Sequence, residues 1–239
     1  MKYIVKMEVQ KNEFPSDYRR LVISFFKKAI SSYMNGAFYE DLYESGARKK
    51  SLVWSIGFKN PQFSGETIFL EEKEVELTLK IADAETALIY YTSLLEMKGK
   101  NFPLPNGNMM KLNSIRMVKE KVINGDMALF KILSPICLKQ HLDHSNKDWY
   151  VSIGSEDFAL ELQRKLIEDY PERQADVERL LFNFDGLKRV IVRAYGLKIP
   201  ATIGTMVIQG KSDILNMILT NGIGSKRNSG FGLVDVIEQ

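Results

Sequence analysis

The residues that most clearly suggest chemistry lie in a glycine-rich run near the end of the chain. Two Gly-hydrophobic-Gly triplets stand there, five residues apart: Gly222-Ile223-Gly224 and Gly230-Phe231-Gly232. Glycine lacks Cβ and tolerates positive φ, so such a run lets backbone N–H groups converge on an anion. Because Lys226 and Arg227 lie between the triplets, we expect that anion to be a phosphate of a nucleic-acid backbone.

Two familiar nucleotide-binding loops do not fit this run. A Walker loop has four residues between its two glycines and a lysine after the second glycine. Here five residues lie between Gly224 and Gly230, and Phe231 follows the second glycine. A dinucleotide fingerprint would require glycine or alanine at Arg227. The run also leads from a helix expected over 212–220 to a strand expected over 233–237, whereas a Walker loop leads from strand to helix.

The doubled triplet before a terminal strand resembles the signature of the CRISPR-associated endoribonucleases that cut precursor crRNA within its repeats. This family belongs to the RAMP superfamily of repeat-associated RNA-binding proteins, and the resemblance covers eleven contiguous positions. It implies two tandem ferredoxin-like (RRM-like) domains in an α+β fold. It also implies CRISPR repeat RNA as the partner, other subunits of an interference complex as further partners, and no cofactor or metal.

The resemblance further implies a cleavage in which the ribose 2′-OH attacks the scissile phosphate, leaving a 2′,3′-cyclic phosphate and a 5′-OH. Such a reaction needs a base, a cation for the phosphorane and an acid for the leaving oxygen. Many members carry Leu-His-x-x-Gly just after the first helix, and in the matching run, residues 42–51, Tyr43 occupies the histidine position. We expect Tyr43, or Tyr39 one turn earlier, to position the 2′-OH, and Lys49 or Lys50 to stabilise the phosphorane.

Three alternatives remain beside this interpretation. The two histidines of the chain, His141 and His144, could supply the missing group from a polar loop, although surface histidines or a zinc ligand pair are other interpretations of the same spacing. The chain could bind repeat RNA without cutting it, with Tyr43 as a packing or stacking residue. Outside nucleic acids, it could be an α+β protein-interaction module.

A second basic surface is expected on the strand over 187–198. Alternation along a strand places Arg189, Arg193 and Tyr195 on one face and Lys188 on the other. Arginine and tyrosine side chains suit phosphates and stacked bases, so Lys188, Arg189 and Arg193 are candidate RNA contacts. Trp54 and Trp149 lie in strand-like stretches, and we expect both in the core.

The order of the expected elements is the same in both halves. In the first half it is a strand (3–9), a helix (15–35), two strands (51–58 and 67–81), a helix (83–97) and a strand (109–119). In the second half, strands over 130–138 and 149–153 precede a helix from Ser155, and a polar helical stretch that closes at 181–184 follows. Two strands (187–198 and 201–209, joined at Ile199-Pro200), a helix and a strand then complete the chain. Each half therefore predicts a βαββαβ ferredoxin-like domain, 1–122 and 123–239.

The composition is that of a globular protein with a local rather than a global basic surface. The 239 residues carry a net charge of +3, with 45% hydrophobic and 26% charged residues. No apolar run approaches the roughly 18 residues of a membrane span, and residues 1–6 lack the apolar stretch of a signal peptide. Cys137 is the single cysteine and cannot form an internal disulfide. We therefore expect a cytoplasmic protein without a membrane partner.

Overall fold

The computed structural model describes residues 1–44, 52–141 and 148–238, and the chain divides into two compact units. The first unit comprises residues 1–119 with 193–197, and the second comprises residues 120–192 with 198–239. Lys49, Lys50 and His144 lie outside the described residues. Within the described ranges, no helix is both long and apolar enough to cross a membrane.

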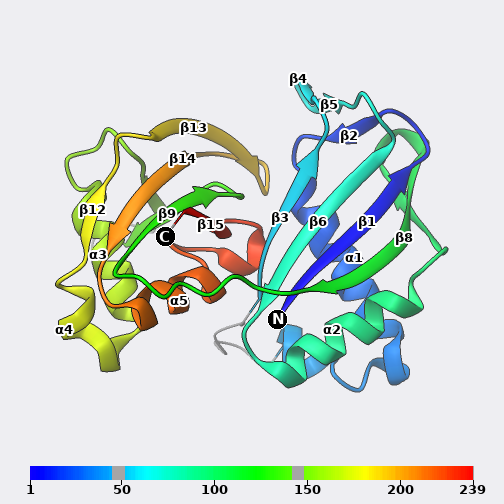
Figure 1. Cartoon of the computed structure of the whole chain (residues 1–239). Helices are drawn as coiled ribbons and strands as arrows, with labels where there is room; N and C mark the ends of the chain where they lie inside the picture. The colour runs from blue at the N-terminus through cyan, green and yellow to red at the C-terminus, as the bar shows by residue number, and fades with distance from the viewer. Residues whose placement is uncertain (45–51, 142–147, 239) are drawn as a thin grey trace. The chain divides into compact units, whose positions relative to one another are not determined.

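The first unit is built around an antiparallel sheet. Its strands and helices are β1 (Lys2–Val9), β2 (Glu13–Pro15), α1 (Tyr18–Ser32), β3 (Leu52–Phe58), β4 (Gln62–Ser64), β5 (Thr67–Phe69), β6 (Glu74–Ile81), α2 (Ala84–Glu96), β7 (Asn101–Leu104) and β8 (Asn108–Val118). The sheet order is β3-β6-β1-β8-β7 (Figure 1), and β2, β5 and β4 form a separate small sheet. The chain order β1-α1-β3-β6-α2-β8 with this strand order is the ferredoxin-like arrangement, as the sequence predicted.

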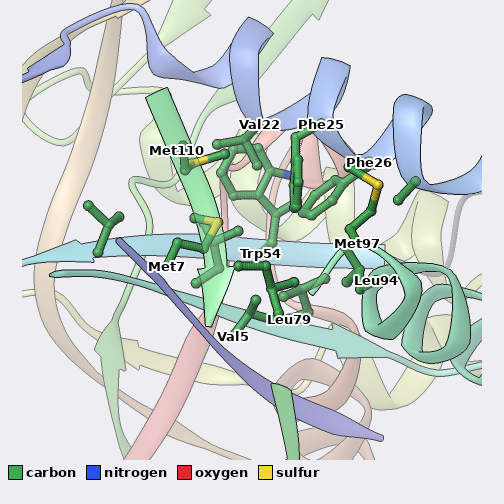
Figure 2. Packing of buried hydrophobic residues seen from close by; sticks show 14 of the residues in the cluster. Val5, Met7, Val22, Phe25, Phe26, Trp54, Leu79, Leu94, Met97 and Met110 are labelled. Carbon is green, nitrogen blue, oxygen red and sulfur yellow. The ribbon is translucent and has the colours of Figure 1, made fainter. Parts of the chain in front are cut away.

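The core of the first unit lies between α1, α2 and the main sheet. Trp54 of β3 is 0% exposed, as predicted, and meets the ring of Phe26 edge-on at 5.9 Å and 88°. Figure 2 shows Trp54 beside Phe25 and Phe26 of α1, with Leu94 of α2 nearby. Aromatic pairs of this geometry stabilise a core beyond the area that they bury, so they fix α1 on the sheet.

The second unit repeats the same arrangement. Its strands and helices are β9 (Met127–Ile132), β10 (Leu138–His141), β11 (Asp148–Val151), α3 (Phe158–Asp169), α4 (Gln174–Val177), β12 (Leu181–Asn183), β13 (Leu187–Ala194), β14 (Leu197–Gln209), α5 (Ser212–Asn221) and β15 (Val234–Glu238). The sheet order is β12-β14-β9-β15, and β13 pairs with β14 (Figure 1). The predicted fold class, two tandem ferredoxin-like domains, is therefore confirmed.

The ends of α2 follow local signals, whereas those of the other helices depart from them. The helix expected over 15–35 is shorter than predicted, because Pro15 belongs to β2 and α1 spans only Tyr18–Ser32. The Asp83 carboxylate accepts the N–H of Thr86 at 2.7 Å, which is the expected N-cap of α2. The helix expected to begin at Ser155 begins instead at Phe158, because a turn closed by the Phe158 N–H on the Ser155 carbonyl precedes it. Ser212, expected to cap α5, is its first residue.

Three strand predictions were wrong in their limits. The strand expected over 67–81 is divided into β5 and β6, and the strand expected over 130–138 ends at Ile132 because the next N–H groups bond to the Leu233 carbonyl. The hairpin expected to turn at Ile199-Pro200 turns at Tyr195 and Gly196, whose φ values are 56° and 78°. Two successive positive φ values suit a tight hairpin turn, so Tyr195 lies in the turn rather than on a strand face.

Candidate functional site

The glycine-rich run is held in place by hydrogen bonds within the second unit. The Ile223 N–H donates to the Gly232 carbonyl at 2.9 Å, which joins the two triplets directly. The Gly232 N–H donates to Pro135 at 2.9 Å and the Ser225 N–H donates to Cys137 at 2.6 Å. These bonds attach both triplets to the segment between β9 and β10, so much of the run's backbone already has partners inside the protein.

Close packing requires glycine at two positions of the run, Gly224 and Gly232. Gly222, Gly224, Gly230 and Gly232 all have positive φ and are all buried. A Cβ on Gly224 would lie 2.8 Å from the Cys137 carbonyl oxygen, and one on Gly232 would lie 1.9 Å from that of Ile223. At Gly224 and Gly232 the chain's own backbone occupies the space that a Cβ would need, and the expected convergence of N–H groups on an anion stays a prediction.

The two cations between the triplets have different environments. The Arg227 guanidinium makes a bidentate ion pair with Asp169 at the end of α3, with distances of 2.6 Å and 2.9 Å. The Asp169 side chain is 3% exposed and that of Arg227 is 17% exposed. Lys226 takes φ of 57°, and its ammonium lies 5.9 Å from the centre of the Tyr150 ring. Arg227 therefore anchors the run to α3, and Lys226 is the better candidate to meet a ligand.

On β13, the predicted RNA contacts differ in exposure. Lys188 and Arg189 are exposed, whereas Arg193 is half-buried. Alternation along β13 keeps Arg189 and Arg193 on one face, with the exposed Ile191 between them. Trp149 departs from expectation, because its side chain is 61% exposed at β11 rather than buried in the core.

Tyr43 lies in a π-helical turn, η2 (Glu40–Glu44), and is joined to α2 by a hydrogen bond. Its hydroxyl oxygen is 2.8 Å from that of Tyr90, and either hydroxyl can be the donor. Burial raises the pKa of Tyr43 well above its usual value, and burial raises the pKa of Tyr90 to about 12. Both phenols are therefore neutral at physiological pH, and Tyr43 is suited to donate or accept a hydrogen bond rather than to act as a base.

Two further side chains surround Tyr43. The ring of Tyr39 lies 5.5 Å away, tilted by 31°, and the ammonium of Lys27 lies 5.2 Å from the centre of the Tyr43 ring. Lys27 is a candidate that sequence reasoning missed, because in the sequence it is one of several polar residues of α1. The chain reverses direction after α1, where Met34 and Asn35 take φ of 46° and 57°. This reversal brings Tyr43 back beside Lys27 of α1.

Of the four remaining candidate residues, the structure describes one, His141. Lys49 and Lys50 fall outside the described residues, and so does His144. His141 is the last residue of β10. Among the residues that the structure describes, no three His, Cys, Asp or Glu side chains are grouped so that they could hold a metal ion.

Comparison with solved structures shows that the whole fold is shared. A structure described as "An RAMP protein binding different RNA substrates" matches with a TM-score of 0.83 at 18% identity, over 100% of both chains. The product of a Cas6-related gene from Pyrococcus furiosus matches with a TM-score of 0.83 at 19% identity, over 100% of this chain and 99% of that one. A Thermus thermophilus Cas6 in a product complex matches with a TM-score of 0.74 at 15% identity, over 99% of this chain and 100% of that one.

Comparison with family models gives a match over the second half of the chain. Residues 118–236 match the family described as "CRISPR associated protein Cas6, C-terminal", and this stretch includes the whole glycine-rich run. No curated protein matches the sequence. The family match, together with the tandem ferredoxin-like fold over the full length, shows that this chain belongs to the Cas6 family of CRISPR-associated proteins.

Proposed function

We propose that this protein is a metal-independent endoribonuclease that cuts CRISPR repeat RNA. The observation that carries the proposal is the family match over residues 118–236, which contains the glycine-rich run. The similar structures include one described as binding different RNA substrates and one in a product complex, which supports RNA as the ligand. In the proposed reaction the ribose 2′-OH attacks the neighbouring phosphate, and the products carry a 2′,3′-cyclic phosphate and a 5′-OH.

In this proposal, RNA is held by cations of the second unit, of which Lys188 and Arg189 are exposed and Lys226 is half-buried. Lys226, Lys188 and Arg189 are placed to contact phosphates, and each such contact makes binding weaker at higher salt. Arg227 and the four glycines act indirectly, because they fix the backbone on which Lys226 is carried. Arg193 contributes less positive charge to β13, because its guanidinium is paired with the Glu66 carboxylate at 2.8 Å.

Catalysis is proposed at the segment that follows α1. A neutral Tyr43 hydroxyl can donate a hydrogen bond to the 2′-OH or a phosphate oxygen, or accept one from the 2′-OH, depending on which partner donates in its bond with Tyr90. Lys27, 5.2 Å from the Tyr43 ring, brings a positive charge to this segment, and Lys49 and Lys50 add two more in the neighbouring sequence. Fixed positive charge stabilises a phosphorane without requiring a histidine. Tyr39 then acts as a packing partner of Tyr43.

A second candidate function is an RNA-holding subunit that does not cut. The observation that favours it is the anchoring of Tyr43, whose hydroxyl is bonded to Tyr90 and whose ring packs against the core of the first unit. A residue held in this way can be a structural replacement for a catalytic histidine. In that case the chain would bind the repeat as part of a larger CRISPR complex.

The experiment that separates these functions uses the repeat RNA of the genome that encodes this chain. Wild-type protein is incubated with end-labelled repeat RNA, and the products are tested for a 2′,3′-cyclic phosphate. The double variant Lys49→Ala, Lys50→Ala should lose cleavage much more than affinity, whereas His141→Ala and His144→Ala should leave both unchanged. Tight binding without product would establish the RNA-holding function, and weak, salt-insensitive binding would indicate a protein-interaction module instead.

A further inference from the structure

A pocket in the second unit is lined by none of the residues that the sequence assigned to cleavage. Its volume is about 480 Å³, and it is lined by residues 149–155 with Arg189 of β13 and Pro200 of β14. Pockets for small ligands commonly measure roughly 300–1,000 Å³. The pocket is therefore large enough for one nucleotide, and every lining residue comes from a single unit.

The lining combines a flat aromatic ring with a flat cation. Trp149 is 61% exposed and Arg189 is exposed, so both side chains are accessible to a ligand. Indole and guanidinium planes are the partners on which single-stranded RNA bases stack. Gly154 has φ of 94° and nothing within 4 Å of the position of a Cβ, so the backbone of the loop is open to close approach at that point.

Positive charge lies beside the same pocket. The Lys226 ammonium is 5.9 Å from the centre of the ring of Tyr150, a lining residue. Lys139 stands directly opposite Tyr150 in the β10–β11 pairing, on the same side of that hairpin. The acidic residues Glu156 and Asp157 lie beyond the lining segment. A ligand with an aromatic base and an attached phosphate fits this combination.

We propose that this pocket holds one single-stranded nucleotide of the bound RNA, with its base stacked on Trp149 and its phosphate near Arg189 and Lys226. The proposal rests on the RNA-binding function proposed above and assigns one nucleotide of the substrate to a defined place. Stacking on an aromatic ring tolerates any base, so the pocket recognises single-strandedness rather than sequence.

The first test uses the chain's own fluorescence. The protein has two tryptophans, and Trp54 is 0% exposed, so a ligand in solution reaches only Trp149. Adding repeat RNA to the wild type should quench part of the tryptophan emission, and the quenching should disappear in Trp149→Phe. Unchanged emission of the wild type at an RNA concentration that saturates binding would overturn the proposal.

The second test locates the nucleotide by a double-mutant cycle. Single abasic nucleotides are placed in turn along the repeat RNA, and affinities are measured for wild type, Trp149→Ala and the control Leu181→Ala, which alters another exposed apolar side chain of the same unit. Trp149→Ala should lower affinity by about 5- to 150-fold, whereas Leu181→Ala should not. At one position the abasic substitution should weaken binding to wild type and have no further effect on Trp149→Ala.

The outcomes separate this proposal from the proposed function. If wild type binds repeat RNA tightly and Trp149→Ala binds it equally well, the pocket does not hold a nucleotide, while the RNA-binding function stands. If wild type binds no repeat RNA, the proposed function fails and the pocket assignment fails with it. Thermal unfolding of both alanine variants confirms that the exposed substitutions leave the fold intact.

Discussion

The hydroxyl oxygens of Tyr43 and Tyr90 lie 2.8 Å apart, and this hydrogen bond joins the residue at the family's histidine position to the core of the first unit. Burial raises the pKa of both phenols, so neither provides a phenolate at neutral pH. In the proposed cleavage, Tyr43 would therefore contribute position and a hydrogen bond, and lysine would supply the charge for the phosphorane.

The Tyr43–Tyr90 pair predicts a loss of stability at high pH. The pKa of Tyr90 is raised from 10.0 to about 12 in the folded state, so its contribution is complete below pH 10 and is lost as pH rises toward 12. Over that window the unfolded chain releases the proton first, which favours unfolding. We expect the stability advantage of wild type over Tyr90→Phe to shrink by about 1.4 kcal/mol by pH 11, one pH unit above the unfolded pKa of about 10.

Urea unfolding of both proteins at about pH 8 and about pH 11 measures this difference. Other tyrosines and the lysines titrate in both proteins, so their effects cancel in the comparison. An advantage that stays constant between the two pH values would show that the Tyr90 phenol is not perturbed.

Lys27 and its neighbour Lys28 form a matched pair for testing charge at the catalytic segment. The Lys27 ammonium lies 5.2 Å from the centre of the Tyr43 ring, whereas Lys28 is exposed on α1. Because a fixed cation stabilises the phosphorane, Lys27→Ala should lower the single-turnover cleavage rate by about tenfold or more. Lys28→Ala should leave the rate unchanged. Equal rates for the two variants would show that Lys27 does not contribute to cleavage.

Alanine substitutions of the adjacent residues Lys226 and Arg227 should change different properties of the protein. Arg227→Ala removes the bidentate partner of the buried Asp169 carboxylate, so we expect unfolding to become easier by roughly 3 kcal/mol. Lys226→Ala should change stability little but should lower RNA affinity and reduce the salt dependence by about one phosphate contact. Urea unfolding and RNA titration at several salt concentrations measure both effects. An Arg227→Ala protein of normal stability with weakened RNA binding would reverse the assignment.

Substitution of the loop glycines should affect folding before it affects RNA. Gly224→Ala and Gly232→Ala introduce a Cβ against carbonyl oxygens at 2.8 Å and 1.9 Å, in addition to a positive φ. We expect each to destabilise the protein by roughly 2–5 kcal/mol. Gly196→Ala is the control, because φ is 78° there and nothing lies within 4 Å, so only the conformational cost of roughly 1–2 kcal/mol remains. Equal unfolding free energies for Gly232→Ala and Gly196→Ala would contradict the packing role.

The sequence predicts the order of elements well because that order depends on local patterns. Alternation marked β1 and β6, and Asp83 with Gly99 marked the two ends of α2. The turn of the β13–β14 hairpin was misplaced because Pro200 is a strong turn signal, whereas Tyr195 in a left-handed conformation is not. The division of the strand over 67–81 depends on pairing of β5 with β2 and β4, which no local pattern reveals.

The candidate site is less predictable because exposure and partners are tertiary properties. The spacing of the triplets indicated the loop correctly, but only the structure shows that Gly224 faces the Cys137 carbonyl and that Arg227 pairs with Asp169. Trp149 was expected in the core because strand residues of this type usually are, yet β11 forms its own two-stranded sheet with β10 and leaves the indole exposed. Lys27 gave no signal, because its position depends on the chain reversal after α1.

The most direct test of the central claim compares two RNA substrates in the presence of EDTA. One is the repeat RNA of the source genome, and the other is identical except for a 2′-deoxy nucleotide immediately upstream of the cut. The proposed chemistry predicts cleavage of the first, with a cyclic phosphate product, and no cleavage of the second, because the nucleophile has been removed. Cleavage of the deoxy substrate, or activity that EDTA abolishes, would contradict a metal-independent attack by the 2′-OH.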